Sequence, residues 1–267
     1  MTMPTPAGKF VSLAPQWMTE ASKIAMRHYQ SFDKDTGVMT KDDNSPLTKA
    51  DLEVDAYLCN VLETAFPDIA VVTEEHASSH DLDVSQGLFF LVDPIDGTRE
   101  FINKRDEFTI NIALVENGKP VAGVVCAPAI NRCFLGAVNG AAVEIDMVSG
   151  KSRPIHVSIP DNNALRVVAS RSHLSPETKE FIDAHPVADM KSAGSSLKFC
   201  LLATGEADIY PRFGPTMEWD TAAGHAVLLA AGGFVNNLDG SELTYAKTEF
   251  RNPWFIAGAT GTISKTI

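Results

Sequence analysis

The stretch that decides the fold is Leu-Phe-Phe-Leu-Val-Asp-Pro-Ile-Asp-Gly-Thr, residues 88–98. Its apolar run stops abruptly at Asp93, and a short apolar run bounded by turn signals predicts a buried strand. Pro94 and Gly97 then turn the chain, which leaves Asp93 and Asp96 close together. Two carboxylates at such a separation repel each other unless a proton or a cation intervenes. A hard cation such as Mg²⁺ takes oxygen ligands, but Asp-Pro and Asp-Gly are also common turn dipeptides, and both interpretations stay open here.

The bulk composition is that of a globular protein with one large domain or two small ones. The chain has 267 residues, of which 45% are hydrophobic, and 34 acidic against 22 basic residues give a formal net charge of −12. This balance argues against a nucleic-acid polymer as partner, because such a partner requires a basic footprint. A phosphate substrate would therefore need cations to hold it. The four cysteines form no CxxC pair, so we expect buried free thiols rather than disulfides or a zinc site.

The sequence also predicts where the protein works. The first ten residues lack the apolar core of a signal peptide, and no apolar run has the length of a transmembrane segment. We therefore expect a cytoplasmic protein, with peripheral association with the inner membrane left open. The oligomeric partner is unknown from the sequence, and a monomer is favoured.

Helix and strand signals alternate and predict a mixed α+β fold. In the first half, Thr48 and Asp51 resemble a capping box, Asn117-Gly118 predicts a hairpin turn, and His76 and His80 are expected to be solvent-exposed loop histidines. Helices are expected at 15–30 and 48–65, strands at 69–73, 88–92, 108–115, 121–126, 134–138 and 142–145, a turn or short hairpin at 33–46, and a loop at 76–87.

Residues 149–160 are rich in turn formers and are a candidate boundary between two halves. The second half is expected to hold helices starting after Ser175 and at 195–203 and 221–231, and strands at 165–169, 207–210, 234–237 and 254–258.

Acidic residues gather where the predicted elements begin or end. These positions are Asp51, Glu74-Glu75, Asp93, Asp96 and Asp220. Each also has a plain structural interpretation, since Asp51 and Asp220 suit helix caps and Glu74-Glu75 suits a solvated loop. The sequence contains no GxxxxGK[ST], GxGxxG, HExxH or GxSxG motif.

In their order and spacing, these motifs resemble the magnesium-dependent, lithium-sensitive phosphatase superfamily of inositol monophosphatase. The matching pieces are Asp51, Glu74-Glu75, 93–98, Trp219-Asp220 and Gly232-Gly233. Four further stretches are similar to its branch of CysQ-type 3′(2′),5′-bisphosphate nucleotidases, namely 96–102, 107–114, 194–200 and 210–216. Inositol phosphatases usually follow Asp-Gly-Thr with Thr-Asn-Phe, whereas this chain continues with Arg-Glu-Phe.

The resemblance implies an α+β fold, a layered α/β/α/β/α sandwich of the inositol monophosphatase / fructose-1,6-bisphosphatase type. Residues 1–150 would form an N-terminal α+β subdomain with most metal ligands. Residues 151–267 would form a C-terminal α/β subdomain with Asp220 and the nucleotide contacts, the two making one compact catalytic unit. Two to three Mg²⁺ ions are implied: Glu74, Asp93 and the Ile95 carbonyl would hold the first, Asp93, Asp96 and Asp220 the second, and Glu74 would help to hold a third.

The resemblance also assigns roles around these ions. Asp51, Thr98 and Glu74 are the implied catalytic residues, with Thr98 and Asp51 orienting and deprotonating the attacking water. A helix-start hydroxyl is the plainer interpretation of Thr98. The implied substrate-binding residues are Gly97, Thr98, Asp220, His173, Ser195, Lys198 and Arg212. For the last four, ordinary surface polarity is the alternative.

The implied activity is Mg²⁺-dependent hydrolysis of the 3′-phosphate of 3′-phosphoadenosine 5′-phosphate, which gives AMP and phosphate. Hydrolysis of 3′-phosphoadenosine 5′-phosphosulfate to adenosine 5′-phosphosulfate is a further open reaction. An inositol monophosphatase or a sugar bisphosphatase is the alternative within the superfamily. A non-catalytic, metal-dependent nucleotide-binding protein is the alternative of another class, but such a protein needs no water-activating Thr98–Asp51 pair.

Overall fold

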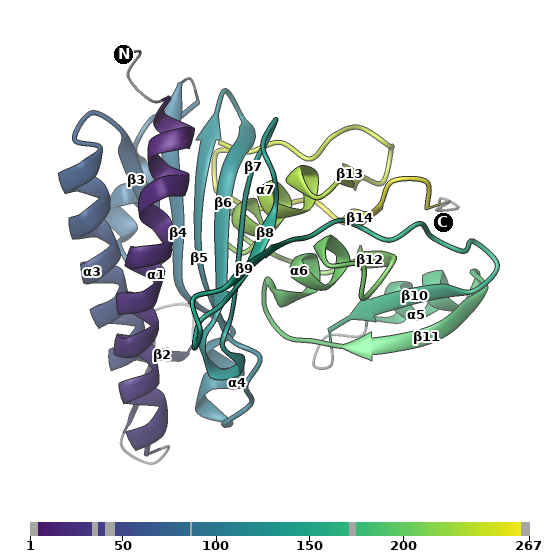
Figure 1. Ribbon diagram of the computed structural model, residues 1–267, viewed down its shortest axis with the longest axis horizontal. Coiled ribbons are helices and arrows are strands. Elements are labelled where there is room, and N and C mark those ends of the chain that lie inside the picture. The colour runs from purple at the N-terminus through teal and green to yellow at the C-terminus, as the bar shows by residue number, and fades with distance from the viewer. Residues whose placement is uncertain (1–4, 34–36, 41–45, 86, 171–174, 263–267) are drawn as a thin grey trace.

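The computed structural model describes residues 5–33, 37–40, 46–85, 87–170 and 175–262. Its elements stack in five layers (Figure 1): a helix pair, a seven-stranded sheet, a second helix pair, a five-stranded sheet and an outer helix. The expected α/β/α/β/α sandwich is confirmed.

The helices are α1 Pro6–Ser31, α3 Lys49–Ala65, α4 Thr98–Ile102, α5 Pro176–Asp183, α6 Leu197–Ala203 and α7 Ala222–Ala230, with 3₁₀ turns η1 Ala77–Asp81 and η2 Pro128–Ile130. The larger sheet contains β3 Ala70–Thr73, β4 Leu88–Asp96, β5 Thr109–Glu116, β6 Lys119–Ala127, β7 Arg132–Ala137, β8 Val143–Asp146 and β9 Ser152–Pro154. The smaller sheet contains β10 Leu165–Ala169, β11 Val187–Ser192, β12 Ile209–Arg212, β13 Gly233–Asn237 and β14 Phe255–Ala259, and β1 Val38–Thr40 pairs with β2 Pro46–Thr48 as a hairpin.

The two sheets differ in how their strands run. The larger sheet keeps sequence order from β3 to β9, with β3 and β4 parallel and the remaining pairs antiparallel. The smaller sheet has the order β11-β10-β12-β14-β13, in which β10 is parallel to both of its neighbours. The last strand of the larger sheet lies after residue 150, and the division of the chain into two subdomains stays a prediction.

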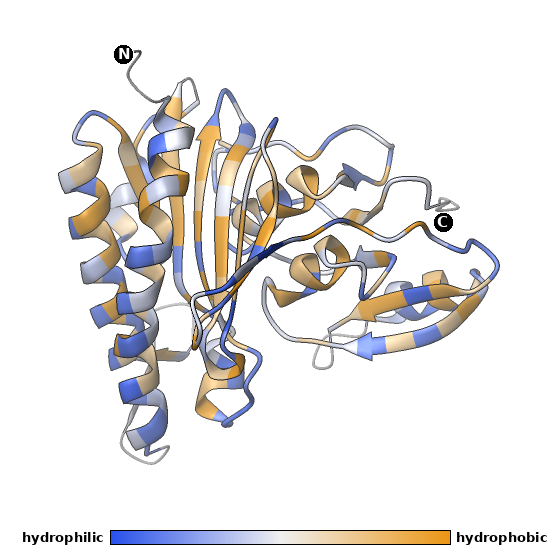
Figure 2. Cartoon of the chain, in the orientation of Figure 1, coloured by the Kyte–Doolittle hydropathy of each residue, from blue (hydrophilic) through white to orange (hydrophobic). Residues whose placement is uncertain are grey.

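Apolar side chains fill the space between the layers. Figure 2 shows mostly orange strands in the larger sheet and helices α1 and α3 banded in orange and blue. One core cluster lies between α1, α3 and the larger sheet, and a second joins both sheets through α6 and α7. Since the second cluster crosses the molecule, the two sheets are packed on a shared core.

Helix α7 approaches the larger sheet closely because a glycine faces it. A Cβ atom at Gly123 would lie 2.5 Å from the Ala223 carbonyl oxygen, which is shorter than any stable contact. The glycine therefore lets α7 lie against β6, and this brings the residues just before α7 to the end of the larger sheet.

The predicted start of α1 is wrong, and the edge strands β9 and β11 were not predicted. The helix begins at Pro6, with Thr5 as its N-cap, and continues through Pro15. A proline inside a helix costs about 3 kcal/mol, but the buried Phe10 and Trp17 on either side offset this cost. Strand β11 is mostly exposed at an edge of its sheet, so it lacks the apolar alternation by which a strand is recognised.

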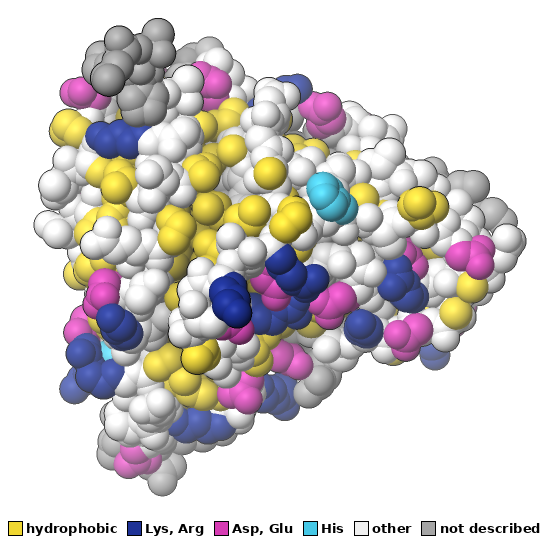
Figure 3. All heavy atoms as spheres, viewed as in Figure 1, with side chains coloured by type: hydrophobic (Ala, Val, Ile, Leu, Met, Phe, Trp, Pro, Cys, Tyr) yellow, Lys and Arg dark blue, Asp and Glu magenta, His cyan; other side chains and the backbone are white. Residues whose placement is uncertain are grey.

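On the face shown in Figure 3, lysine and arginine side chains lie among acidic ones rather than in a continuous basic surface. Within the described ranges, no helix combines the length and apolar character needed to cross a bilayer.

Candidate active site

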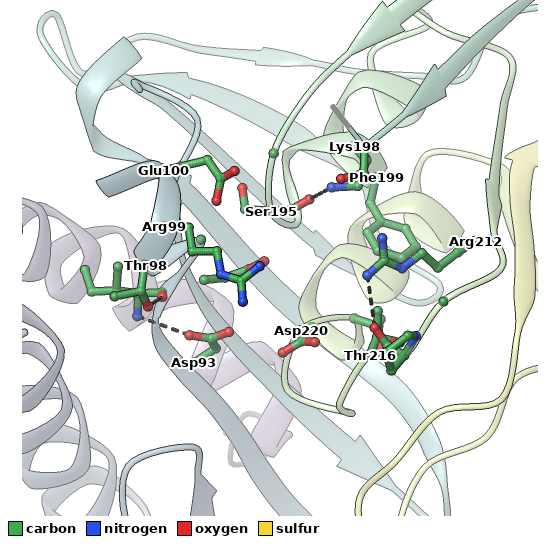
Figure 4. A pocket seen from close by; sticks show the side chains of 18 of the residues that line it. Asp93, Thr98, Arg99, Glu100, Ser195, Lys198, Phe199, Arg212, Thr216 and Asp220 are labelled. Carbon is green, nitrogen blue, oxygen red and sulfur yellow. Dashed lines mark hydrogen bonds between the residues drawn. The ribbon is translucent and has the colours of Figure 1, made fainter. Parts of the chain in front are cut away.

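The candidate site is a cavity of about 730 Å³ that collects most of the residues singled out in the sequence. Asp93 and Asp220 lie on one side of it, and Lys198 and Arg212 on another (Figure 4). The carboxylates come mainly from the end of the larger sheet, whereas Lys198 and Arg212 come from α6 and β12. The cavity is thus built from both halves of the chain.

The end of β4 places two carboxylates in the cavity. The pairing of β4 with β5 is interrupted between Asp93 and Asp96, and the Ile95 amide donates to Asp93 Oδ1 at 3.1 Å. Gly97 then adopts a φ of +91°, a conformation that residues other than glycine rarely take. The predicted strand is confirmed, but it continues past Val92 to Asp96, and the chain turns at Gly97. The irregular segment before this turn is held by the Asp93 carboxylate itself.

Asp96 is fixed by groups from other elements. Its Oδ2 accepts the Ser196 amide at 2.6 Å and the Asn111 side-chain amide at 3.3 Å. The Ser196 hydroxyl in turn donates to the Asp220 carbonyl at 2.5 Å. Because Ser196 contacts both acidic segments, it links the end of β4 to the start of α7.

Glu74 and Asp220 complete the acidic side. The parallel register of β3 and β4 pairs Thr73 with Val92, so Glu74 emerges beside Asp93. Carboxylate oxygens of Glu74, Asp93 and Asp220 all lie within 4.8 Å of one another. The N-cap of α7 is Thr221 rather than Asp220, and Asp220 Oδ2 instead accepts the Met217 amide at 2.8 Å. The helix-cap interpretation of Asp220 is therefore wrong.

The acidic cluster is electrostatically unfavourable without a cation. Burial, reinforced by the neighbouring acidic groups, raises the pKa of Asp93 and of Asp220 well above the usual range. Burial also raises the pKa of Asp96 to about 6, although Lys198 opposes this shift. An all-oxygen set of carboxylates around the buried Asp93 fits a hard divalent cation, whose charge removes the repulsion.

Asp51 uses its two carboxylate oxygens for two different purposes. Oδ2 accepts the Thr48 amide at 2.8 Å, which confirms the predicted capping box at the start of α3. Oδ1 accepts the Thr98 hydroxyl at 3.2 Å, and the same hydroxyl also lies 3.2 Å from the Ile95 carbonyl. The structural and catalytic interpretations of Asp51 are therefore compatible, since each uses a different oxygen.

Lys198 and Arg212 are not ordinary surface residues. Lys198 is only 5% exposed, and its ammonium donates to the Ser195 carbonyl at 2.6 Å. Burial lowers its pKa to about 8, with Arg212 adding to this shift and Asp96 opposing it. Arg212 Nη2 donates to the Pro215 carbonyl at 3.0 Å, while its buried Nε has no hydrogen-bond partner within the described part of the chain.

Ser195 lines the cavity, but its hydroxyl already donates to the Glu107 carbonyl at 2.7 Å. Ile95, Gly97 and Thr98 also line it, whereas His173 lies outside the described residues.

Two residues that line the cavity were not among the predicted site residues. Arg99 and Glu100 line the cavity from α4. Their only signal in the sequence is that they replace the Thr-Asn that usually follows Asp-Gly-Thr in inositol phosphatases. The expectation of an exposed loop is wrong for His80, which stacks on Trp219 with ring centroids 4.9 Å apart and bonds to the Thr73 carbonyl at 2.8 Å. The 3₁₀ turn η1 therefore ties the segment before Glu74 to the residue before Asp220.

With this geometry established, comparisons with known proteins define the class. The model of the inositol monophosphatase family matches residues 9–258. The chain therefore belongs to the inositol monophosphatase family.

Relatives within the family carry a more specific name. The chain is 44% identical over 223 residues to the 3′(2′),5′-bisphosphate nucleotidase CysQ of Escherichia coli K12, covering 83% of this chain and 89% of the relative. It is 37% identical over 247 residues to the protein of the same name from Buchnera aphidicola, covering 91% of each. The crystal structure of CysQ from Bacteroides thetaiotaomicron superposes with a TM-score of 0.78 at 35% identity, covering 93% of this chain and 96% of that one.

Proposed function

We propose that this protein is a 3′(2′),5′-bisphosphate nucleotidase that hydrolyses the 3′-phosphate of 3′-phosphoadenosine 5′-phosphate to give AMP and phosphate. The observation that carries the proposal is one cavity with a carboxylate cluster on one side and two cationic side chains on another. The carboxylates supply a site for metal ions at one phosphate, and Lys198 and Arg212 supply charge for a second. The CysQ relatives support the same assignment.

Magnesium is the cofactor that the donor set suits best. Glu74, Asp93 and the Ile95 carbonyl would hold one ion, Asp93, Asp96 and Asp220 a second, and Glu74 would contribute to a third. When bound, Mg²⁺ would polarise the phosphoryl oxygens and neutralise charge on the attacking and leaving oxygens. Metal ions on the carboxylate side would also explain how a protein with a net charge of −12 binds a negatively charged phosphate, because the ions lie between the two.

Thr98 and Asp51 would take up the proton that the attacking water loses. The Thr98 hydroxyl donates to Asp51 Oδ1, so its own lone pairs are available to accept a proton from water. As the water oxygen attacks phosphorus, its proton passes to Thr98 Oγ1, and the Thr98 proton passes to Asp51 Oδ1. The bond from phosphorus to the 3′ oxygen breaks, the leaving oxygen takes a proton from solvent water, and Asp51 then releases its proton to solvent. Asp51 keeps its position during this transfer because its other oxygen is held by the Thr48 amide.

Lys198 and Arg212 would bind the phosphate that is not cleaved. The Arg212 guanidinium matches phosphate oxygens in a bidentate manner, and its Nε, which has no hydrogen-bond partner among the described residues, would supply one of the two donors. 3′-Phosphoadenosine 5′-phosphosulfate also carries an anionic 5′ group, and its conversion to adenosine 5′-phosphosulfate belongs to the same proposal.

A rate comparison tests the proposal. Phosphate release with saturating Mg²⁺ is measured for 3′-phosphoadenosine 5′-phosphate, inositol 1-phosphate and fructose 1,6-bisphosphate. We expect kcat/KM to be highest for the nucleotide. A higher value for inositol 1-phosphate or for the sugar bisphosphate would assign the chain to another activity of the family, and nucleotide binding without phosphate release would exclude an enzyme.

A further inference from the structure

Three side chains with different ligand atoms meet outside the cavity, next to the segment that carries Glu74. Asp55 and Cys59 come from α3, and His76 follows β3. We propose that Asp55, Cys59 and His76 form a second cation site, which binds Zn²⁺ or a similar borderline-soft divalent ion. This site is separate from the proposed magnesium site and has a different chemistry.

The three ligand atoms already lie close to the positions that a zinc ion requires. Asp55 and Cys59 are four residues apart on one helix and so project from the same face. One carboxylate oxygen of Asp55, Cys59 Sγ and one ring nitrogen of His76 all lie within 4.8 Å of one another. His76 Nε2 is 3.1 Å from Asp55 Oδ2, and Cys59 Sγ is 3.9 Å from the other oxygen, Oδ1. A tetrahedral zinc ion with bonds of about 2.0–2.3 Å holds its ligand atoms roughly 3.3–3.7 Å apart. Small side-chain rotations would therefore close the site around an ion.

The surroundings resemble those of a built metal site. Thr73 donates its hydroxyl to Asp55 Oδ1, and ligating carboxylates are commonly oriented by such a hydrogen bond. Asp55 is 1% exposed and Cys59 is 8% exposed, whereas the His76 side chain is 53% exposed. The open side at His76 gives an ion access from solvent and leaves a fourth position for water.

The charges of the three groups suit a divalent ion. The Asp55 carboxylate and the Cys59 thiolate together carry two negative charges, and His76 binds as neutral imidazole. Binding therefore displaces the thiol proton of Cys59 to solvent and leaves the buried site neutral. In the metal-free protein, burial and the nearby Asp55 raise the pKa of Cys59 to about 12, and a bound cation reverses this effect.

The donor set separates this site from the carboxylate cluster. Thiolate and imidazole ligands favour zinc, whereas Mg²⁺ takes oxygen ligands and keeps several waters. The expectation that the cysteines form no zinc site depended on CxxC spacing. That spacing does not detect a site whose ligands come from a helix and from the segment after a strand.

Cobalt is the first probe, because it reports on the sulfur ligand directly. Co²⁺ is added to the full chain in excess Mg²⁺, and the near-ultraviolet charge-transfer absorption of a thiolate–cobalt bond is recorded. We expect the band to saturate at one equivalent, to disappear in Cys59→Ser and to persist in Cys133→Ser, a matched buried cysteine. Cobalt at an all-oxygen site gives no such band. Absence of the band in the native chain, or its persistence in Cys59→Ser, overturns the proposal.

Zinc affinity is the second measurement, and it uses a variant at an exposed position that keeps the fold. The Kd for Zn²⁺ is obtained by competition with a chromophoric chelator. We expect His76→Ala to raise this Kd by at least about 10- to 100-fold, because loss even of a group that only supports a ligand has an effect of this size. His156→Ala changes another exposed histidine and should leave the Kd unchanged. An unchanged Kd in His76→Ala also overturns the proposal.

Discussion

The two sides of the cavity are built in different ways. On the carboxylate side, the acidic groups sit at the ends of β3 and β4 and before α7, and backbone amides at residues 95, 196 and 217 hold three of them. On the cationic side, Lys198 and Arg212 belong to short elements of the second half and contact carbonyl oxygens. Under the proposed function, the carboxylate side would hold the metal ions that support the reaction, and the cationic side would select the substrate. Variants on the carboxylate side should therefore lower kcat. Variants on the cationic side should lower kcat/KM for the substrate that carries a second phosphate.

The largest effect is expected on the carboxylate side. Asp93→Asn keeps the shape of the side chain but removes the charge proposed to face two ions. Losing one electrostatic contact in a transition state costs roughly 10²–10³-fold in kcat, and we expect a loss at or above the upper end. In the metal-free protein the same change should raise Tm, because it removes a buried charge whose pKa is raised by burial and by acidic neighbours. Near-normal kcat at saturating Mg²⁺ would contradict the assignment.

The second-largest effect is expected for Asp51, and two variants separate its contact with the Thr48 amide from its contact with the Thr98 hydroxyl. In Asp51→Asn the side-chain oxygen can still accept the Thr48 amide, but the residue no longer accepts a proton from Thr98. We expect kcat to fall by about 10²–10⁴-fold with little change in Tm. Asp51→Ala should show the same loss of kcat and also lose about 0.5–2 kcal/mol of stability with the cap. Equal Tm values for the two variants would show that the cap contributes nothing.

On the cationic side the effect should depend on the substrate. A hydrogen bond to a charged group contributes about 1.5–3 kcal/mol, or about 10- to 150-fold in binding. We expect Arg212→Ala to lower kcat/KM by this factor for 3′-phosphoadenosine 5′-phosphate and to change it little for 3′-AMP. Arg212→Lys should lie between, because lysine lacks the bidentate fork. Equal losses on both substrates would place Arg212 at the cleaved phosphate or in a structural role.

The smallest effect is a pH dependence of stability in the metal-free protein. Burial raises the pKa of Asp96 to about 6, against about 3.9 in an unfolded chain. The folded state therefore binds this proton more tightly, and the resulting stabilisation is present below pH 4 and lost as the pH rises through 6. With chelator, the free energy of unfolding should fall between pH 4.5 and 7 by an amount on the order of 1–2 kcal/mol, which is measured by denaturant unfolding at each pH. The fall should be smaller with Mg²⁺ and in Asp96→Asn.

The carboxylate side could be predicted only in part from local signals, because the ends of the predicted elements located the acidic residues, whereas their role came from the resemblance to the family. A buried strand followed by turn residues placed Asp93 and Asp96, and the cap pattern placed Asp51. The cationic side was not accessible in this way. Lys198 lies in an otherwise apolar stretch of sequence, but this does not show what its ammonium group faces, because that depends on how the second half packs against the first. The role of Ser196 in linking two acidic segments, and the stacking of His80 on Trp219, depend on the same long-range packing.

The close contact of α7 with β6 through Gly123 has a consequence for the order of events during synthesis. Glu74, Asp93 and Asp96 leave the ribosome long before Asp220, and α7 is the element that delivers Asp220 to them. At about 5–20 residues per second, the nascent chain waits on the order of ten seconds with an incomplete carboxylate cluster. Under the proposed assignment, a chain arrested before α7 lacks a complete magnesium site, so full activity begins only when the second half has been made and has docked.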